Sequence, residues 1–201
     1  MRPGGFAFGE LMRVIGLAGW SGAGKTTLLV RLIPELNRRG LTVSTLKHAH
    51  HAFEIDQPGK DSFEHRAAGA SEVLVASGRR WALMHELRGE DEPSLPDLLR
   101  RLSPVDLVVV EGFKSYAHPK IEIFRAANGK PVLFGHVPNI RSIASDGPLA
   151  DAPVPLVDLN DVMSVADAVL REAMPLDRVL AELDAGPRPG RLPLDRLRGP
   201  A

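Results

Sequence analysis

Short apolar runs alternate along the chain with segments in which apolar residues recur at helical spacing. Two runs, 12–18 and 106–110, are almost wholly apolar, which predicts central strands covered on both faces. The expected strands are 12–18, 41–46, 72–76, 80–84, 106–110, 120–125, 132–135, 140–144 and 155–157, and the expected helices are 25–39, 62–68, 94–102, 162–172 and 176–183. This alternation predicts an α/β fold with a doubly wound, mostly parallel sheet, helices on both faces and a mixed or antiparallel edge.

Glycine and proline residues mark where these elements end or bend. Gly40 is expected to end the first helix, and Pro34 to kink it. Gly78 is expected at the turn of a hairpin. The expected divisions of the chain are a flexible leader at 1–11, a nucleotide-binding domain at 12–173 and a mobile C-terminal tail at 174–201.

A glycine-rich motif joins the first expected strand to the first expected helix. Residues 19–27 read GWSGAGKTT, which fits the phosphate-loop pattern G-x-x-x-x-G-K-[ST]; a plain glycine turn is the alternative. Glycines let successive N–H groups point at a phosphate, and the start of the helix adds positive potential. Lys25 is expected to reach the β- and γ-phosphates, Thr26 to hold Mg²⁺ and Thr27 to contact the α-phosphate. The expected phosphate-binding residues are Gly19, Ser21, Gly22, Ala23, Gly24, Lys25, Thr26 and Thr27.

An acidic residue, Glu111, directly follows the apolar run 106–110. Ligands of open α/β sheets bind at the carboxyl ends of the strands. The pattern therefore indicates the Walker B element of phosphate-loop NTPases, whose acid orients Mg²⁺ directly or through water. A solvated glutamate after a core strand is the alternative.

A long charged loop follows the second expected strand, and its histidines allow three roles. His48, His50 and His51 are suited to contact an anionic ligand, to form structural hydrogen bonds or to bind a metal. No carboxylate or thiolate stands at standard metal spacing from them. His85, His118 and His136 are scattered and are expected at the surface or in loops.

The same loop holds Asp56, Lys60 and Asp61, which are expected to lie beside the phosphates. Asp56 is expected to contact Mg²⁺ or orient water at the γ-phosphate, or else to stabilise the loop. Asp61 stands just before an expected helix that Ser62 is suited to cap, so Asp61 is either a ligand or a helix cap.

Recognition of the base is less well defined. A guanine site needs a carboxylate that accepts hydrogen bonds from N1–H and N2–H₂, and the N/T-K-x-D signature is absent. Asp146 follows an expected strand, with Asn139 and Arg141 nearby, and is the candidate; a turn aspartate before Gly147 is the alternative. No arginine finger or water-positioning glutamine is evident near the phosphate loop, so hydrolysis is expected to be slow.

The composition excludes several classes of function. The 25 basic and 25 acidic residues cancel, so no broad positive field is expected for nucleic acid. The absence of cysteine excludes disulfides, thiolate metal sites and cysteine nucleophiles. No apolar run reaches the roughly 18–20 residues of a membrane span, and residues 1–10 lack the apolar region of a secretory signal. A cytoplasmic protein without nucleic-acid or membrane partners is expected.

Further motifs occur in a specific order, and together they resemble one family. They are TLKHAHH at 45–51, DQPGKDS at 56–62, EHRAAGA at 64–70 and VVVEGFK at 108–114. With the phosphate loop, these motifs resemble MobB, the molybdopterin-guanine dinucleotide biosynthesis protein B family, over roughly residues 12–172. The resemblance implies a homodimeric P-loop protein that binds GTP and Mg²⁺, hydrolyses GTP weakly and assists the guanylyltransferase MobA, which joins GMP to molybdopterin.

The resemblance also implies roles for particular residues. It assigns phosphate binding to Gly22, Gly24, Lys25, Thr26 and Thr27, the Walker B role to Glu111, and a position beside the phosphates to His48, His50, His51, Asp56, Lys60 and Asp61. On this reading Lys25, Glu111 and Asp56 are the catalytic residues of a weak GTPase, and Thr26, Glu111 and Asp56 contact Mg²⁺.

Two other functions are compatible with a phosphate loop. One is an ATP-dependent small-molecule kinase, but such kinases carry an arginine lid that Arg79–Arg80 and Arg100–Arg101 do not clearly form. The other is a metal-delivery GTPase, against which the lack of cysteine and of a long histidine-rich tail weighs. The leading interpretation is a GTP-binding adaptor in molybdenum cofactor biosynthesis.

Overall fold

The computed structural model describes residues 12–49, 53–150, 152–190 and 192–197, which form two compact units. The hairpin unit is Ala49–Ser94, and the sheet unit comprises the residues on either side of it. Residues 49–94, which lie within the nucleotide-binding domain expected over 12–173, pack mainly among themselves. The expected leader at 1–11, together with His50 and His51, lies outside the described residues.

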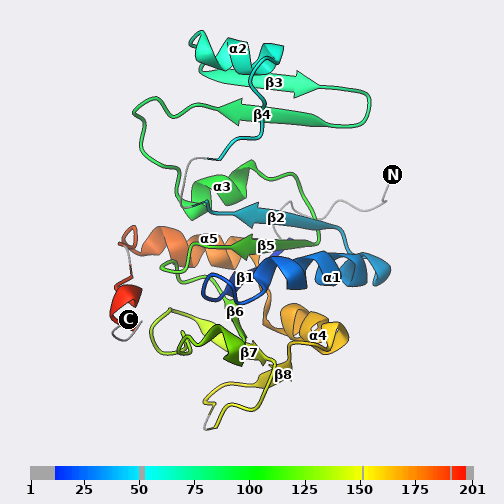
Figure 1. Cartoon of the computed structure of the whole chain (residues 1–201), viewed down its shortest axis with the longest axis vertical. Coiled ribbons are helices and arrows are strands. Elements are labelled where there is room, and N and C mark those ends of the chain that lie inside the picture. Colours follow the sequence, from blue (N-terminus) through cyan, green and yellow to red (C-terminus); the bar gives the residue numbers. More distant parts are fainter. Residues whose placement is uncertain (1–11, 50–52, 151, 191, 198–201) are drawn as a thin grey trace. The chain divides into compact units, whose positions relative to one another are not determined.

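A mostly parallel sheet forms the centre of the sheet unit (Figure 1). Its strands are β1 (Arg13–Ala18), β2 (Val43–Lys47), β5 (Leu107–Glu111), β6 (Lys120–Phe124), β7 (Ile140–Ser145), β8 (Leu156–Asp158) and β9 (Met174–Pro175). The helices are α1 (Lys25–Arg38), α3 (Leu95–Arg101), α4 (Val162–Glu172) and α5 (Leu176–Ala185), with 3₁₀ turns η1 (Ala126–Asn128) and η2 (Leu194–Leu197). The strands lie in the order β2-β5-β1-β6-β7-β8, all parallel, and β9 pairs antiparallel with β1. The doubly wound α/β fold is therefore confirmed.

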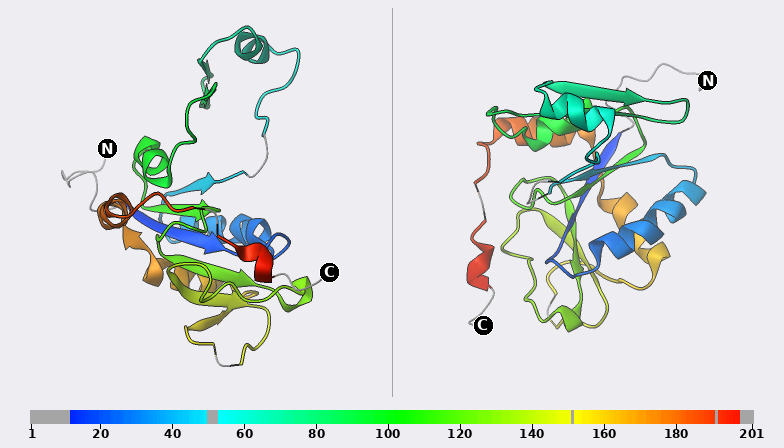
Figure 2. Two further views of the ribbon diagram at one scale, coloured as in Figure 1. Left: turned by 90° about the vertical axis from the view of Figure 1, so that its left-hand side faces the viewer. Right: turned by 45° about the horizontal axis from the view of Figure 1, so that its top comes forward.

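Helices cover both faces of this sheet. On one face, Ile15 and Leu17 of β1 share a buried cluster with Leu32 of α1 and Val169 of α4. The two helices lie side by side on this face (Figure 2). On the other face, Val14 belongs to a cluster with side chains of α3 and α5. Successive side chains of β1 thus enter opposite cores, which explains why the strand is apolar after Arg13.

The expected end of the first helix is confirmed. Gly40 has φ of 84°, its N–H donates to the carbonyl of Asn37, and the N–H of Leu41 donates to the carbonyl of Leu36. These bonds satisfy carbonyls that the end of α1 leaves unpaired, and the left-handed conformation favours glycine.

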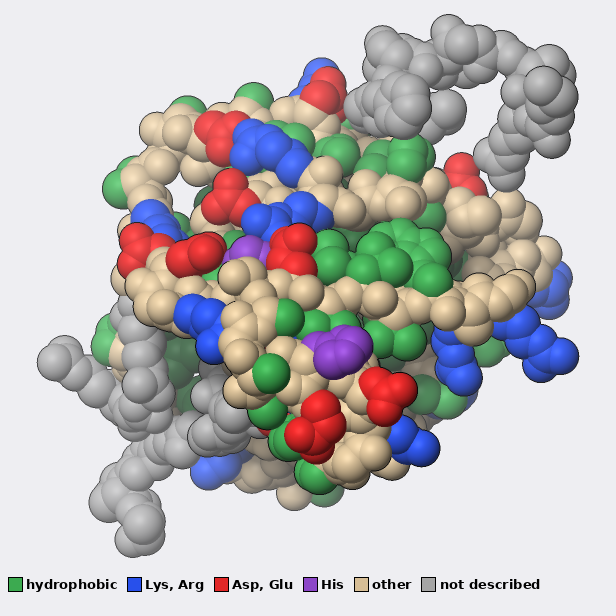
Figure 3. Space-filling view, turned by 90° about the horizontal axis from the view of Figure 1, so that it is seen from above, with side chains coloured by type: hydrophobic (Ala, Val, Ile, Leu, Met, Phe, Trp, Pro, Cys, Tyr) green, Lys and Arg blue, Asp and Glu red, His purple; other side chains and the backbone are tan. Residues whose placement is uncertain are grey.

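The hairpin unit contains α2 (Asp61–Ala67) and an antiparallel pair, β3 (Glu72–Ala76) and β4 (Trp81–His85). The expected hairpin is therefore confirmed. The expectation that Ser62 caps α2 is wrong: the helix begins at Asp61, and the Ser62 hydroxyl donates to Oδ1 of Asp56 at 2.9 Å. The face in Figure 3 carries acidic and basic side chains next to one another, with hydrophobic side chains beside them.

The segment 132–135 forms no strand, contrary to the expectation. The backbone N–H groups of Leu133 and Phe134 donate to the carboxylate of Glu122, at 2.6 and 2.9 Å. Glu122 is on β6 and is almost fully buried. Because its carboxylate uses these N–H groups, they are not available to a neighbouring strand.

Part of the chain after residue 173 packs on the sheet. Met174 pairs with Val14 of β1 in β9. Val179 of α5 is fully buried in the same cluster as Leu95 and Leu99 of α3. A helix was expected within this segment, but its apolar stripe also covers one face of the sheet.

Candidate functional site

The turn between β1 and α1 carries the glycine-rich motif. Gly22 and Gly24 have φ of 82° and 88°, a left-handed conformation that strains other residues. A Cβ atom at Gly19 would lie 2.8 Å from the carbonyl oxygen of Ile123, so no side chain fits there. Gly24 precedes α1 and has no side chain to accept hydrogen bonds from the first helical turn. The N–H groups at the start of α1 are therefore suited to an anion.

Lys25 is the first residue of α1, and its side chain folds back over the loop. Its Nζ donates to the carbonyl oxygens of Gly19 and Trp20, at 3.1 and 2.9 Å. The pKa of Lys25 is lower than its ordinary value, mainly because burial disfavours the charged form. The nearby carboxylate of Glu111 opposes this shift, and the charge of Lys47 adds to it. The glycine loop thus has a lysine, an acid and a second lysine close together.

Strand register explains this grouping. Glu111 on β5 pairs with Leu17 on β1 and with Lys47 on β2. The carboxyl ends of three parallel strands therefore meet beside the loop, as the sequence predicts for Glu111. Of the remaining loop residues, Ala23 is buried, whereas Ser21, Thr26 and Thr27 are exposed.

His48 packs against the turn that follows Glu111. Its N–H donates to the carbonyl of Glu111 at 2.8 Å, and its ring centroid lies 4.6 Å from that of Phe113. Gly112 has φ of 95°, and a Cβ atom there would lie 2.6 Å from Cβ of His48. These contacts show one structural role for His48, while its predicted contact with an anion stays a prediction.

Residues 125–128, which follow β6, also lie against the glycine loop. Asn128 donates from Nδ2 to the carbonyl of Ser21 at 3.1 Å, and a Cβ atom at Gly22 would lie 3.0 Å from Oδ1 of Asn128. Nη1 of Arg125 lies 3.3 Å from Oδ2 of Asp146. The segment therefore joins the glycine loop to the end of β7.

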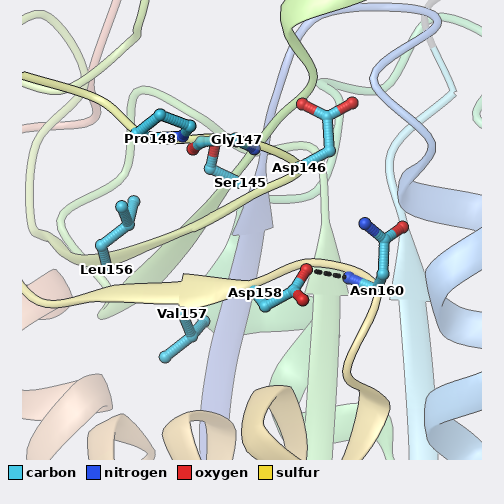
Figure 4. A pocket seen from close by; sticks show the side chains of 8 residues that line it. All are labelled: Ser145, Asp146, Gly147, Pro148, Leu156, Val157, Asp158 and Asn160. Atoms are coloured by element: carbon cyan, nitrogen blue, oxygen red, sulfur yellow. Dashed lines mark hydrogen bonds between the residues drawn. The ribbon is translucent and has the colours of Figure 1, made fainter.

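A pocket of about 290 Å³ lies at the carboxyl ends of β7 and β8. It is lined by Ser145, Asp146, Gly147, Pro148, Leu156, Val157, Asp158 and Asn160. In Figure 4 the side chains of Asp146 and Asn160 extend to the same side of β8, and that of Val157 extends to the other. Asp146 is mostly buried, and its Oδ1 accepts the N–H of Ala126 at 2.9 Å. The strand end that was expected to carry a base contact thus borders a pocket.

Three further predicted site residues, Asp56, Lys60 and Asp61, belong to the hairpin unit, and their contact with phosphates stays a prediction. Asp56 has a clear local role: Oδ1 accepts from the N–H of Gln57 and the hydroxyl of Ser62, and Oδ2 lies 3.5 Å from Nε of Arg66. Asp61 is the first residue of α2. His50 lies outside the described residues.

The described residues contain neither a metal-binding cluster nor a membrane-spanning helix. Within that part of the chain, no group of three or more His, Cys, Asp or Glu side chains is arranged to hold a metal. Nor is any helix there long and apolar enough to cross a membrane.

Sequence reasoning missed Lys47, Arg125 and Asn128, which lie at or after strand ends beside the loop. Each follows, or ends, a strand that was expected from the sequence. The usable signal was therefore a polar residue at the carboxyl end of a parallel strand. Choosing among such residues needs the order of the strands, which a single sequence does not state.

Comparison with known proteins identifies the family. The family model described as "MobB: Molybdopterin guanine dinucleotide synthesis protein B" matches residues 14–146. The chain belongs to the MobB family. It is 45% identical over 163 residues to the molybdopterin-guanine dinucleotide biosynthesis adapter protein of Escherichia coli, covering 80% of this chain and 93% of that protein. It is 39% identical to the adapter protein of the same name from Haemophilus influenzae, covering 78% of this chain and 86% of that protein.

The fold of this MobB-family chain also resembles solved structures. A crystal structure of molybdopterin-guanine biosynthesis protein B aligns with a TM-score of 0.61 at 27% identity. The alignment covers 79% of this chain and 98% of that one. The resemblance seen in the motifs is therefore confirmed at the level of family and fold.

Proposed function

We propose that this chain binds GTP with Mg²⁺ at the 19–27 loop and acts as an adapter in molybdopterin-guanine dinucleotide biosynthesis. The observation that carries the proposal is the grouping of Lys25 and Glu111 at a glycine loop whose glycines leave the start of α1 open. The names of the relatives support the pathway, and the chemistry of the loop supports the binding of phosphates.

The phosphates would be held by the loop and the first turn of α1. Gly22 and Gly24 supply close backbone approach, and Lys25 supplies a positive charge. Thr26 and Thr27 expose their side chains at the helix start, where a hydroxyl is a donor for a phosphate oxygen. Ser21 and Gly19 complete the loop.

Mg²⁺ fits the oxygen donors present. The ion prefers hard oxygen ligands and keeps several waters, with one or two protein ligands beside the phosphates. The Thr26 hydroxyl and the Glu111 carboxylate are such ligands, and Glu111 lies close to Lys25. When bound, the ion would neutralise charge on the phosphates.

Guanine would be read by Asp146 at the mouth of the pocket. Each of its carboxylate oxygens accepts one hydrogen bond in the structure. Because a carboxylate has about four acceptor positions, it retains capacity for the N1–H and N2–H₂ donors of guanine. An adenine presents no such pair of donors, so its binding would leave these positions unpaired.

The partners in this proposal are the guanylyltransferase MobA, molybdopterin and a second copy of the chain. The hairpin unit supports the last of these. Leu74 and Leu83 lie opposite each other in the hairpin, beside the Ala76–Trp81 pair, and Leu74, Leu83 and Trp81 are exposed. An apolar face on an isolated pair of strands is suited to pair with a copy of itself.

Hydrolysis of GTP would be slow, with the chain acting as an adapter.

The experiment that tests the proposal is titration of fluorescent GTP into wild-type protein and Lys25→Ala. Loss of the half-buried ammonium should lower the affinity for GTP roughly 100-fold or more and leave the circular dichroism spectrum unchanged. Lys130→Ala removes the same charge at an exposed position and serves as the control. A folded Lys25→Ala protein with wild-type affinity would overturn the proposal.

The same titration tests the role of Mg²⁺. Glu111→Ala should bind GTP as the wild type does in EDTA, and lose roughly 10- to 100-fold of the affinity that Mg²⁺ adds. Equal losses with and without the ion would contradict a role for Glu111 in holding it.

A further inference from the structure

Arg125 is a charged residue beside the glycine loop to which the proposed function assigns no role. It directly follows β6, and a Cβ atom at Gly24 would lie 3.5 Å from its Nη2 and 3.6 Å from its Nε. Its Nη1 lies 3.3 Å from Oδ2 of Asp146. One guanidinium thus lies between the start of α1 and the carboxylate at the end of β7.

The two edges of this guanidinium are used differently. Nη1 is occupied by Asp146, whereas neither Nε nor Nη2 donates a hydrogen bond to any other residue that the structure describes. The Nε–Nη2 edge carries two parallel donors, which match two oxygens of a phosphate. The side chain is about 36% exposed, and Nη2 and Nε are its atoms nearest to Gly24 of the loop.

Asp146 in turn depends on this segment for its orientation. Both of its hydrogen bonds come from consecutive residues, the side chain of Arg125 and the backbone N–H of Ala126. The segment is anchored to the loop by the bond from Asn128 to the carbonyl of Ser21. A change at Arg125 would therefore alter the carboxylate as well as the charge beside the loop.

We propose that Arg125 binds the phosphate chain of the nucleotide through Nε and Nη2 while Nη1 orients Asp146 for guanine. The inference rests on the proposed function, because it requires a guanine nucleotide at this loop. One side chain then joins affinity for phosphate to selectivity for the base. A lysine would not replace it, since a single ammonium does not offer two separate edges.

The test is displacement of fluorescent GTP by pyrophosphate, GTP and ITP from wild type, Arg125→Ala and Arg125→Lys. Pyrophosphate probes the phosphate contact alone. The ratio of the ITP and GTP dissociation constants probes Asp146, because inosine lacks the N2–H₂ group. The control is Arg171→Ala, which removes an exposed arginine paired with Glu172 on α4.

Arg125→Ala should weaken pyrophosphate binding roughly tenfold or more and move the ITP-to-GTP ratio toward one. Arg125→Lys should recover pyrophosphate affinity in part without restoring the ratio, and Arg171→Ala should change neither quantity. Thermal unfolding without nucleotide shows whether a variant is folded. If Arg125→Ala is misfolded, the two measurements on Arg125→Lys test the inference.

Two results would overturn the inference. Wild-type pyrophosphate affinity in both Arg125 variants would contradict a contact between Arg125 and phosphate. A wild-type ratio of the ITP and GTP dissociation constants would contradict the orientation of Asp146 by Arg125. A wild-type protein that binds no fluorescent GTP would overturn the proposed function itself, so the two failures are distinguishable.

Discussion

At the scale of single residues, two buried ionisable side chains support the strand that leads to the glycine loop. His118 and Lys120 pack on Gly16 of β1, where a Cβ atom would lie 2.4 Å from Nε2 of His118 and 2.9 Å from Cγ of Lys120. The Nζ of Lys120 donates to the carbonyls of Tyr116, His118 and Pro138. Neither ring nitrogen of His118 has a hydrogen-bond partner in the described part of the chain. His118 was expected at the surface or in a loop; it lies in the loop before β6, but it is buried and not at the surface.

The buried histidine predicts that stability depends on pH. Burial lowers the pKa of His118 well below its ordinary value of 6.5, and Lys120 lowers it further. As pH falls through about 6.5, the residue gains a proton in the unfolded chain but stays neutral in the folded one. The free energy of unfolding should therefore fall below about pH 6.5, by up to about 1.4 kcal/mol per pH unit from this group.

Urea unfolding at pH 7.5 and 5.5 measures this effect. His118→Leu removes the titrating ring and no hydrogen bond among the described residues, so the variant should lose less stability between the two pH values. His85 has its pKa raised by hydrogen bonds to Glu72 and Glu90 and contributes equally to both proteins. The same pH dependence in wild type and variant would contradict the account.

Residues of the glycine loop were predictable because their motif is continuous in sequence. Glu111 was predictable because an acid after an apolar run is a local pattern. Arg125 and the buried Lys120 were not, since their roles depend on which strands lie beside β1. The burial of a charged residue at the first position of a strand leaves no trace in the sequence pattern.

At the scale of elements, Glu122 determines the path of the chain after β6. Its carboxylate accepts hydrogen bonds from the N–H groups of Leu133 and Phe134. The pKa of Glu122 is raised because burial disfavours the charged form, and these two bonds offset only part of that shift. The turn that results places Leu133 in a core cluster with Trp20 of the glycine loop. Trp20 also donates from Nε1 to the carbonyl of Pro131, at 2.7 Å. The turn and the loop therefore support each other.

Glu122→Gln should destabilise the protein. The amide has one carbonyl oxygen, so one buried backbone N–H would face an NH₂ group, at a cost of about 2 kcal/mol. Glu182→Gln makes the same change at an exposed position on α5 and should stay within about 0.5 kcal/mol of wild type. Chemical unfolding of both variants gives the comparison, and equal stabilities would show that the carboxylate does not hold the turn.

Most helices and strands were predictable because their apolar spacing is set by the cores they enter. The segment 132–135 misled because Val132, Leu133 and Phe134 are a strand-like run, but the N–H groups of Leu133 and Phe134 donate to a side chain instead. The helix 176–183 was expected, but its packing on the sheet was not. That packing depends on β9, a two-residue strand too short to show a pattern.

At the scale of the whole molecule, the chain consists of the sheet unit and the hairpin unit, and each has its own part in the proposal. The sheet unit holds the glycine loop, Glu111 and Asp146. The hairpin unit holds the exposed apolar face of Leu74, Trp81 and Leu83. Its emergence as a separate unit was not predictable from composition, since no glycine- or serine-rich linker flanks residues 49–94.

The hairpin face predicts a dimer that a single charge should disrupt. Trp81 is 66% exposed, and its partner in the β3–β4 register is Ala76, so a glutamate in its place would put a charge within the proposed interface. Wild type should sediment as a dimer at micromolar concentration and Trp81→Glu as a monomer. Val30→Lys places a charge on another exposed apolar residue, on α1, and should leave the dimer intact. A monomeric wild type, or a dimeric Trp81→Glu protein, would contradict this interface.

In the proposed function, the pocket at the ends of β7 and β8 selects guanine through Asp146, beside a loop that binds phosphates. The most direct test compares GTP and xanthosine triphosphate binding to wild type, Asp146→Asn and Asp158→Asn. Xanthine carries a carbonyl where guanine carries N2–H₂, so an asparagine at 146 would accept from N1–H and donate to that carbonyl.

Asp158 lines the same pocket, but its carboxylate accepts the N–H of Asn160, so Asp158→Asn is the matched control. The account predicts that wild type and Asp158→Asn prefer GTP by roughly tenfold or more, and that Asp146→Asn prefers xanthosine triphosphate by a similar factor. An Asp146→Asn protein that keeps the wild-type preference for GTP would contradict the account.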